Sequence, residues 1–447
     1  MNEENNKFDA IIIGAGVSGL LSALALAKEG KKVLVLEKND YLGGNCRTYK
    51  INGYSVDTGP HAITGLSDGP FATLMDKYFL VKPNFLPINA YYARYGKKFQ
   101  EIPLTFPQFA MFDILSRQDR VLIIGAIMDA IAFSSLNKKA LEKNVYDYIR
   151  KYRLSYKALK FVDALAYFLS GKSMHETPAW RMLGGSGYLD ENGKNNRFGK
   201  LKKIVMNDYS SQGYPMGGIQ NITNCIISSL PEKQVDFKTN ETVKKIITEN
   251  GKAKGVETSG GRYCAELIVY SGFVKELPSI VGGLSDEYCQ NLMKLKQTKS
   301  ITLWLGLKNK LPELAYIGSE LYFNADTPYW AMPVSNFDAR LAPQGKQLIG
   351  FSAVFKEDDL EKQTNRFKKV IFKALPNIEK NIEFEHTQIT IPEKAAVTVG
   401  VRFPSPRSPI KGLYLVGTDT DMRSMGITRA AYSVVEALKF MKEDGVI

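Results

Sequence analysis

The pattern of apolar and polar positions divides the first forty residues into a strand, a helix and a second strand. Residues 8–13 form a short apolar run of strand character. Residues 20–30 carry apolar side chains at helical spacing and end at Gly30, a residue favoured at helix C-caps. Residues 33–37 form a second apolar run that closes on Glu37. This order predicts a β–α–β unit.

A glycine-rich turn joins the first strand to the helix. Gly14 permits a tight turn, Gly16 lets the backbone approach a pyrophosphate, and Gly19 lets the helix pack close to the strand. The helix N-terminus then offers free N–H groups and its positive dipole end to phosphates. Glu37 can accept hydrogen bonds from ribose hydroxyls, and its charge disfavours the 2′-phosphate of NADP. We therefore predict a dinucleotide site at Gly14, Ala15, Gly16, Val17, Ser18, Gly19, Glu37 and Lys38.

Three further motifs follow in the chain. The doublet Gly43-Gly44 lies six residues after Glu37 and is followed by Asn45, Arg47 and Thr48. The second motif is Asp57-Thr58-Gly59-Pro60-His61, and the third lies in residues 210–222, which read SSQGYPMGGIQNI. Together they resemble the fingerprints of the FAD-dependent amine oxidase, protoporphyrinogen oxidase and phytoene desaturase superfamily, most closely its phytoene desaturase branch. Asn45 replaces the arginine usual in that family, so Arg47 is a second candidate for the phosphate contact.

The resemblance extends to the C-terminal segment and implies one non-covalently bound FAD. Residues 412–417 predict a strand that ends at Gly417, and a helix follows near residue 427. The family places an acid beside this glycine; Thr418 holds that position here, so Asp419 or Asp421 takes the role. The helix N-terminus would face the flavin pyrimidine ring. The implied cofactor contacts are Gly43, Gly44, Asn45, Arg47, Thr48, Gly59, Pro60, His61, Val243, Gly417, Asp419, Asp421, Gly426, Ile427 and Thr428.

With this pattern, the resemblance implies an α/β fold, α+β overall, with a Rossmann-like FAD-binding domain and a discontinuous substrate domain. Residues 243–247 and the turn at 249–251 predict a β-hairpin in the FAD-binding domain. Apolar residues at helical spacing dominate the first half of the substrate domain. Strand-like runs at 300–307 and 346–355 and a helix at about 357–374 dominate its second half. The expected FAD-binding segments are 1–75, 206–285 and 393–447; the expected substrate segments are 76–205, mainly helical, and 286–392, a mixed sheet.

The candidate chemistry is hydride transfer to the flavin from an apolar substrate. His61 is the one group with a suitable pKa in a flavin-adjacent motif, so it is the candidate catalytic residue. Tyr329, Trp330 and Met332 are candidates for the pocket lining. The leading hypothesis is dehydrogenation of an isoprenoid-like lipid, with quinone, oxygen or a carrier as electron acceptor. The alternatives are a redox-neutral isomerase or mutase, an amine or porphyrinogen oxidase, and a membrane-associated flavin-binding protein without turnover.

Composition and charge narrow the expected partners. The chain of 447 residues has a formal net charge of +13, which suits an anionic partner. No nucleic-acid-binding signature is present, which leaves an anionic lipid, a phosphorylated ligand, or a solvated lysine-rich surface without a partner. Residues 121–133 are either a buried core helix or a surface that meets an anionic membrane peripherally, with Lys138, Lys139 and Lys143 following in the 121–143 region. The scattered four cysteines and three histidines predict no metal site. The polar N-terminus and the lack of a long apolar run predict a cytoplasmic protein.

Overall fold

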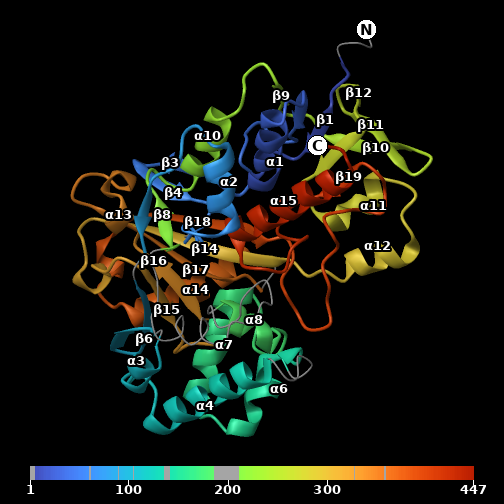
Figure 1. Ribbon diagram of the computed structural model, residues 1–447. Helices are drawn as coiled ribbons and strands as arrows, with labels where there is room; N and C mark the ends of the chain where they lie inside the picture. Colours follow the sequence, from blue (N-terminus) through green and yellow to red (C-terminus); the bar gives the residue numbers. More distant parts are fainter. Residues whose placement is uncertain are drawn as a thin grey trace.

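The computed structural model describes residues 6–59, 62–88, 90–103, 105–134, 141–185, 211–326, 328–356 and 359–447. Two sheets organise the molecule, one near the chain termini and one between that region and a group of helices at the bottom of the view (Figure 1). This arrangement confirms the predicted α/β fold class with a Rossmann-like unit and a second, mixed sheet.

The first sheet is parallel and has five strands in the order β19-β13-β1-β2-β9. Its strands come from three well-separated parts of the chain, so this sheet is assembled from distant segments. The predicted first unit is present as β1, α1 and β2. The sheet strands are β1 (Ala10–Ile13), β2 (Val33–Leu36), β9 (Val235–Lys238), β13 (Leu267–Tyr270) and β19 (Leu413–Leu415).

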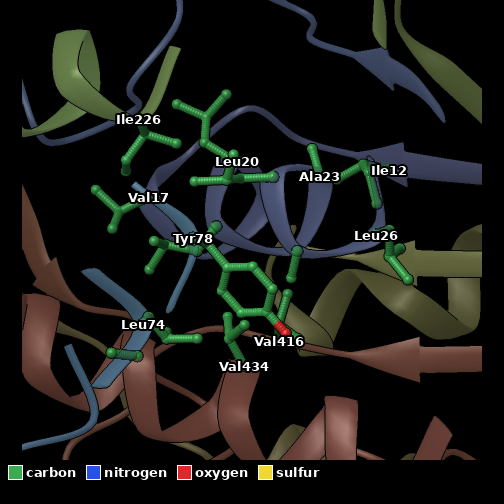
Figure 2. Packing of buried hydrophobic residues seen from close by; sticks show 14 of the residues in the cluster. Ile12, Val17, Leu20, Ala23, Leu26, Leu74, Tyr78, Ile226, Val416 and Val434 are labelled. Carbon is green, nitrogen blue, oxygen red and sulfur yellow. The ribbon is translucent and has the colours of Figure 1, made fainter. Parts of the chain in front are cut away.

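Helices cover one face of this sheet, and a small antiparallel sheet covers the other. Figure 2 shows the helix side, where Leu20 and Ala23 of α1 pack with Tyr78 of α2 and Val434 of α15 in one apolar cluster. The predicted hairpin is present as β10 and β11. The elements are α1 (Val17–Lys28), α2 (Pro70–Tyr78), α10 (Gln220–Ser228) and α15 (Gly426–Glu443) on one side, and β10 (Val243–Glu249), β11 (Lys252–Thr258) and β12 (Arg262–Cys264) on the other.

The second sheet has seven strands in the order β18-β14-β17-β16-β15-β6-β7 and is mixed, because β15 and β6 run parallel. One face is apolar and packs on α14 (Leu360–Ala374) through Phe367 and Ile371. The sheet strands are β18 (Ile382–Glu393), β14 (Thr298–Leu307), β17 (Gln347–Val354), β16 (Tyr329–Met332), β15 (Ser319–Tyr322), β6 (Tyr91–Tyr95) and β7 (Lys98–Glu101).

The other face of this sheet points toward the helical group and the first sheet. A third apolar core lies within the helical group, around Phe112 and Phe161. In the described ranges, none of the helices combines the length and the apolar character that crossing a bilayer requires. The helices of the group are α3 (Phe106–Ala110), α4 (Arg117–Ser134), α6 (Val145–Ile149), α7 (Tyr156–Ser170) and α8 (Ala179–Gly185).

Candidate functional site

A cavity of about 1800 Å³ runs from the glycine turn after β1 to the helical group. Fifteen of the predicted cofactor residues line it. They are Gly14, Gly16, Val17, Ser18, Glu37, Lys38, Gly43, Gly44, Asn45, Arg47, Gly59, Val243, Gly426, Ile427 and Thr428. The structure therefore brings residues from three distant segments to one space.

Two glycine turns face each other at the end of the cavity that lies beside the first sheet. Gly43 donates its N–H to the Ala15 carbonyl over 2.8 Å, and a Cβ on Gly44 would lie 3.2 Å from the Gly16 Cα. A Cβ on Gly16 would meet no protein atom within 4 Å, so this position opens into the cavity. The two turns form a side-chain-free cradle that lets an elongated ligand approach the backbone and the start of α1.

Glu37 is held rigidly beside this cradle. One carboxylate oxygen accepts the Ala15 N–H over 2.9 Å, and the other accepts the backbone and side-chain N–H groups of Asn39 over 2.9 and 2.7 Å. The residue is buried yet lines the cavity, as does Val243 on β10. The carboxylate is thus oriented before any ligand binds.

Six predicted contacts do not line the cavity, and in each of them the side chain or the backbone contacts the protein itself. Gly19 packs against Gly14, and Ala15 donates to Glu37. The hydroxyl of Thr48 donates to Asp57, and Asp421 pairs with Arg423 over 2.6 Å. Gly417 and Asp419 lie behind the lining. Oδ2 of Asp419 accepts the Val274 N–H, and Oδ1 is buried without a partner.

Pro60 and His61 lie outside the described residues, so the catalytic role of His61 stays a prediction.

Asp57 links the second sheet to the segment before α10, which packs with the helices on the first sheet. Its buried carboxylate accepts hydrogen bonds from Thr48, from the Tyr214 hydroxyl over 2.6 Å and from the Ile219 N–H over 3.2 Å. Its backbone carbonyl accepts N–H groups from Trp304 and Gln388 of the second sheet. Burial raises the pKa of Asp57 to about 6, and the three hydrogen bonds oppose that rise.

This raised pKa predicts a pH-dependent stability. Because the folded protein holds the Asp57 proton more tightly than the unfolded chain, its contribution is present below pH 3.8 and is lost as pH rises through about 6. Relative to Asp57→Asn, we expect the free energy of unfolding of the wild type to fall by about 3 kcal/mol across this window. Urea unfolding of both proteins from pH 4 to pH 7 measures the difference; parallel pH curves would contradict it.

The first turn of α15 meets the end of β18 at a group of charged residues that the sequence analysis missed. The Gly426 N–H donates to the Glu393 carboxylate over 2.6 Å, and the other oxygen of Glu393 pairs with Arg429 over 2.8 Å. Both side chains are buried. Lys394, the next residue, lines the cavity and donates to the Ser271 and Gly272 carbonyls. The available signal was the Glu393-Lys394 pair at the end of a strand.

The wall that the second sheet gives to the cavity is polar. Gln388, Thr302, Ser352 and Trp330 lie directly across from one another on β18, β14, β17 and β16, and all four line the cavity. The hydroxyls of Thr302 and Ser352 are 2.7 Å apart. The buried Oε1 of Gln388 and the buried hydroxyl of nearby Thr298 have no hydrogen-bond partner. Sequence reasoning missed this row because short polar side chains on a strand usually face water.

The three predicted pocket residues lie on opposite faces of strand β16. Trp330 and Met332 line the cavity, whereas Tyr329 lies on the opposite face, stacked with Tyr322 and packed on Phe351 and Phe367. The prediction for Tyr329 was therefore wrong, because successive residues of a strand point to opposite faces. Tyr91, which donates to Gln212, and Phe168 complete an aromatic group around Trp330.

The opposite wall is apolar. Each described lining residue of α3, α4, α6 and α7 is aliphatic or aromatic, including Phe109, Ile127, Ile149, Phe161 and Leu165. A ligand would therefore lie between hydrocarbon on one side and hydroxyl and amide groups on the other. Within the part of the chain that the structure describes, no group of three or more His, Cys, Asp or Glu residues is arranged to hold a metal.

Comparison with known proteins agrees with this geometry. A family model described as an NAD(P)-binding Rossmann-like domain matches residues 12–78. The chloroplastic prolycopene isomerase of Daucus carota is 25% identical over 96% of this chain and 79% of its own length. A 1-hydroxycarotenoid 3,4-desaturase of a Flavobacterium strain is 25% identical over 68% of this chain and 64% of its own length.

Two solved structures share the fold across nearly the whole chain. An oxidoreductase from Methanosarcina mazei superimposes with a TM-score of 0.80 at 20% identity and covers 97% of this chain and 100% of its own. A variant of putrescine oxidase superimposes with a TM-score of 0.73 at 14% identity, over 98% and 99% of the two chains. At these identities the structural likeness shows the fold alone.

Proposed function

Because the chain belongs to the FAD-dependent amine oxidase, protoporphyrinogen oxidase and phytoene desaturase superfamily, we propose that it binds FAD non-covalently and dehydrogenates a hydrophobic, isoprenoid-like substrate. Quinone, oxygen or a carrier protein would take up the electrons. The observation that carries the proposal is the continuity of one cavity from the glycine cradle to the apolar helices.

The residues present fit FAD. The open space at Gly16 and the facing Gly43-Gly44 turn suit a pyrophosphate, and Glu37 suits the ribose of the adenosine half. Ile427 and Thr428 bring the first turn of an 18-residue helix to the lining.

When bound, FAD would supply a hydride acceptor at N5. The chain's own residues hold and orient the substrate. Trp330, Phe168 and Tyr91 form an aromatic group in the lining, and the apolar helices keep water away from a bound hydrocarbon. Hydrocarbon burial alone gives about 25 cal/mol per Å², so a long chain needs no charged anchor. A polar end group on such a substrate would meet the Thr302–Ser352 pair and the unpartnered Oε1 of Gln388.

A redox-neutral isomerase is the second candidate. It is favoured by the match to a protein named prolycopene isomerase, which extends over 96% of this chain. A desaturase and an isomerase would share the cofactor cradle and the lipid cavity. They would differ in net electron balance, since isomerisation leaves the flavin in its starting redox state.

The cofactor assignment predicts the behaviour of Glu37→Ala. The purified wild type should be yellow and release FAD on denaturation. Removal of the pre-oriented carboxylate should weaken FAD binding about ten- to a hundredfold, because a charge-assisted hydrogen bond contributes roughly 1.5–3 kcal/mol. Fluorescence titration of the apoprotein with FAD measures this. An unchanged dissociation constant in a folded variant would contradict the role of Glu37, and the absence of FAD binding by the wild type would contradict the cofactor.

We further propose that the substrate arrives from an anionic membrane surface. The inner face of α4 lines the cavity through Ile123 and Ile127, and its outer face exposes Val121 and Met128. Arg117 lies one turn before Val121, and Lys143 is exposed nearby in sequence. Lys138 and Lys139 lie outside the described residues. An exposed apolar strip with basic neighbours suits the boundary between headgroups and acyl chains.

Lipid delivery tests substrate class and membrane contact together. Holoprotein is incubated anaerobically with a cell lipid extract in anionic or zwitterionic vesicles, at low and high salt. We expect bleaching of the flavin spectrum, faster with anionic vesicles and slowed by salt. Conversion of a cis polyene without net bleaching would favour the isomerase. No bleaching and no lipid bound, as judged by mass spectrometry, would contradict the lipid substrate.

A further inference from the structure

We propose that Lys394 is the cation that holds the pyrophosphate of the bound dinucleotide, in place of the arginine that this chain lacks at position 45. The inference rests on the proposed binding of FAD. It assigns a cofactor contact to a residue at the end of the substrate-side sheet, outside the nucleotide-binding fingerprints.

Lys394 lies where the ends of three parallel strands meet. Its Nζ donates to the Ser271 carbonyl over 2.6 Å and to the Gly272 carbonyl over 2.8 Å, just after β13. Ser271 borders the glycine cradle: a Cβ on Gly14 would lie 3.4 Å from the Ser271 carbonyl oxygen. The Ser271 hydroxyl also lies 2.9 Å from that of Ser18, in the first turn of α1. The ammonium group therefore contacts Ser271, and Ser271 in turn contacts the glycine turn where we expect the phosphates to bind.

The third strand fixes the lysine from the other side. The Lys394 N–H donates to the Thr418 hydroxyl over 3.0 Å, and a Cβ on Gly417 would lie 3.0 Å from Nζ. Glycine at position 417 thus leaves the space that the ammonium group occupies. An ammonium group has three N–H donors, and the two carbonyls account for two of them. The third donor remains for a ligand in the cavity that Lys394 lines.

The electrostatics of this position call for an anion. Among the described residues, no carboxylate lies within ion-pair distance of Nζ, although Asp419, Glu276 and Glu37 are near enough to oppose the lowering of the Lys394 pKa by burial. Besides the two carbonyls, the Phe273 ring lies 5.6 Å from Nζ, and none of these groups carries the full negative charge that would compensate a partly buried cation. A pyrophosphate group would supply the missing negative charge, and the start of α1 attracts the same group from the opposite side.

The other cations of the lining are engaged elsewhere. Asn45 is neutral, and its amide donates to the Ile391 carbonyl over 2.6 Å. The Arg47 guanidinium lies 4.2 Å from the Tyr41 ring centre and 5.4 Å from that of Tyr49. Arg181 donates to the Leu169 and Ser424 carbonyls, toward the start of α15. Lys38 follows Glu37, at the ribose end. Lys394 is thus the cation beside the cradle itself.

Competitive binding tests this assignment. Apoprotein is titrated with FAD by fluorescence, and bound FAD is displaced with ADP or with adenosine. Lys394→Met removes the charge and keeps the side-chain length. Lys299→Met makes the same change at an exposed lysine outside the lining and is the matched control. We expect Lys394→Met to weaken FAD and ADP binding about ten- to a hundredfold while adenosine binding changes little, and Lys299→Met to change each by less than about threefold.

Lys394→Arg shows whether a change in FAD affinity comes from loss of the positive charge or from disturbed folding. It keeps the cation, so FAD affinity should stay closer to that of the wild type than to that of Lys394→Met; equal losses in both variants would overturn the proposal. FAD and ADP binding unchanged in Lys394→Met, or ADP and adenosine weakened equally, would also overturn it. These results leave FAD binding by the wild type intact and so differ from failure of the proposed function, in which the wild type binds neither FAD nor ADP and both proposals fail.

Discussion

Gly16→Ala and Gly19→Ala should fail for different reasons, although both replace a glycine of one turn with the smallest chiral residue. Gly19→Ala should be strongly destabilised, because its Cβ would lie 2.0 Å from the Gly14 carbonyl oxygen. Such a backbone clash forces the helix away from the strand, at a cost of about 3 kcal/mol or more. Gly16 has extended backbone angles that alanine adopts freely, and its Cβ would meet only the cavity. Gly16→Ala should therefore fold normally and bind FAD at least about tenfold more weakly.

Urea unfolding of the apoproteins and FAD titration separate the two effects. For Gly19→Ala we expect no cooperative urea-unfolding transition. For Gly16→Ala we expect the urea midpoint of the wild type and a reduced affinity for FAD. If Gly16→Ala bound FAD as the wild type does, the cradle would not be the phosphate site. If Gly19→Ala were as stable as the wild type, the close packing of α1 on β1 would be incorrect.

Arg429→Met should be among the most destabilising single changes outside the apolar cores. It leaves the Glu393 carboxylate buried without its ion-pair partner, which typically costs about 3–5 kcal/mol. The same residue donates to the carbonyls of Ala395 and Ser424, so its loss also frees the turn before α15. We expect a lower urea midpoint and weaker FAD binding, since Gly426 and Ile427 line the cavity.

The double variant Arg429→Met with Glu393→Gln is the control. Glutamine keeps an acceptor for the Gly426 N–H and removes the uncompensated charge, so the double variant should recover part of the stability lost in Arg429→Met. Additive losses in the two single variants would show that the pair contributes no coupling energy.

The sequence predicted the parts of the fold that depend on local periodicity. The β1–α1–β2 unit, the β10–β11 hairpin and α15 carry their signals within short windows. Tyr329 shows a missed step within such a window: once residues 329–332 form a strand, Tyr329 and Trp330 must point to opposite faces. The strand was not predicted, because β16 has only four residues and so gives a weak alternating pattern.

The group of charged residues Glu393, Lys394 and Arg429 depends on contacts that no local sequence pattern predicts. Lys394 reaches Ser271 across 123 positions, and Glu393 reaches Arg429 across 36. The family resemblance directed attention to Asp421, but in the structure Asp421 pairs with Arg423, and Asp419 is buried behind Gly417. Sequence spacing alone does not distinguish two acids two residues apart in an irregular turn, because their directions are set by the surrounding packing.

The course of β18 bears on how the molecule moves. The strand pairs with β14 along the second sheet, and the two residues at its end are fastened to β13, Thr418 and α15 beside the first sheet. The two sheets therefore cannot swing apart about a simple hinge without peeling this strand end away. Any separation of the two sheets would then begin with local fraying of residues 391–394, whose backbone N–H groups would lose their protection from hydrogen exchange.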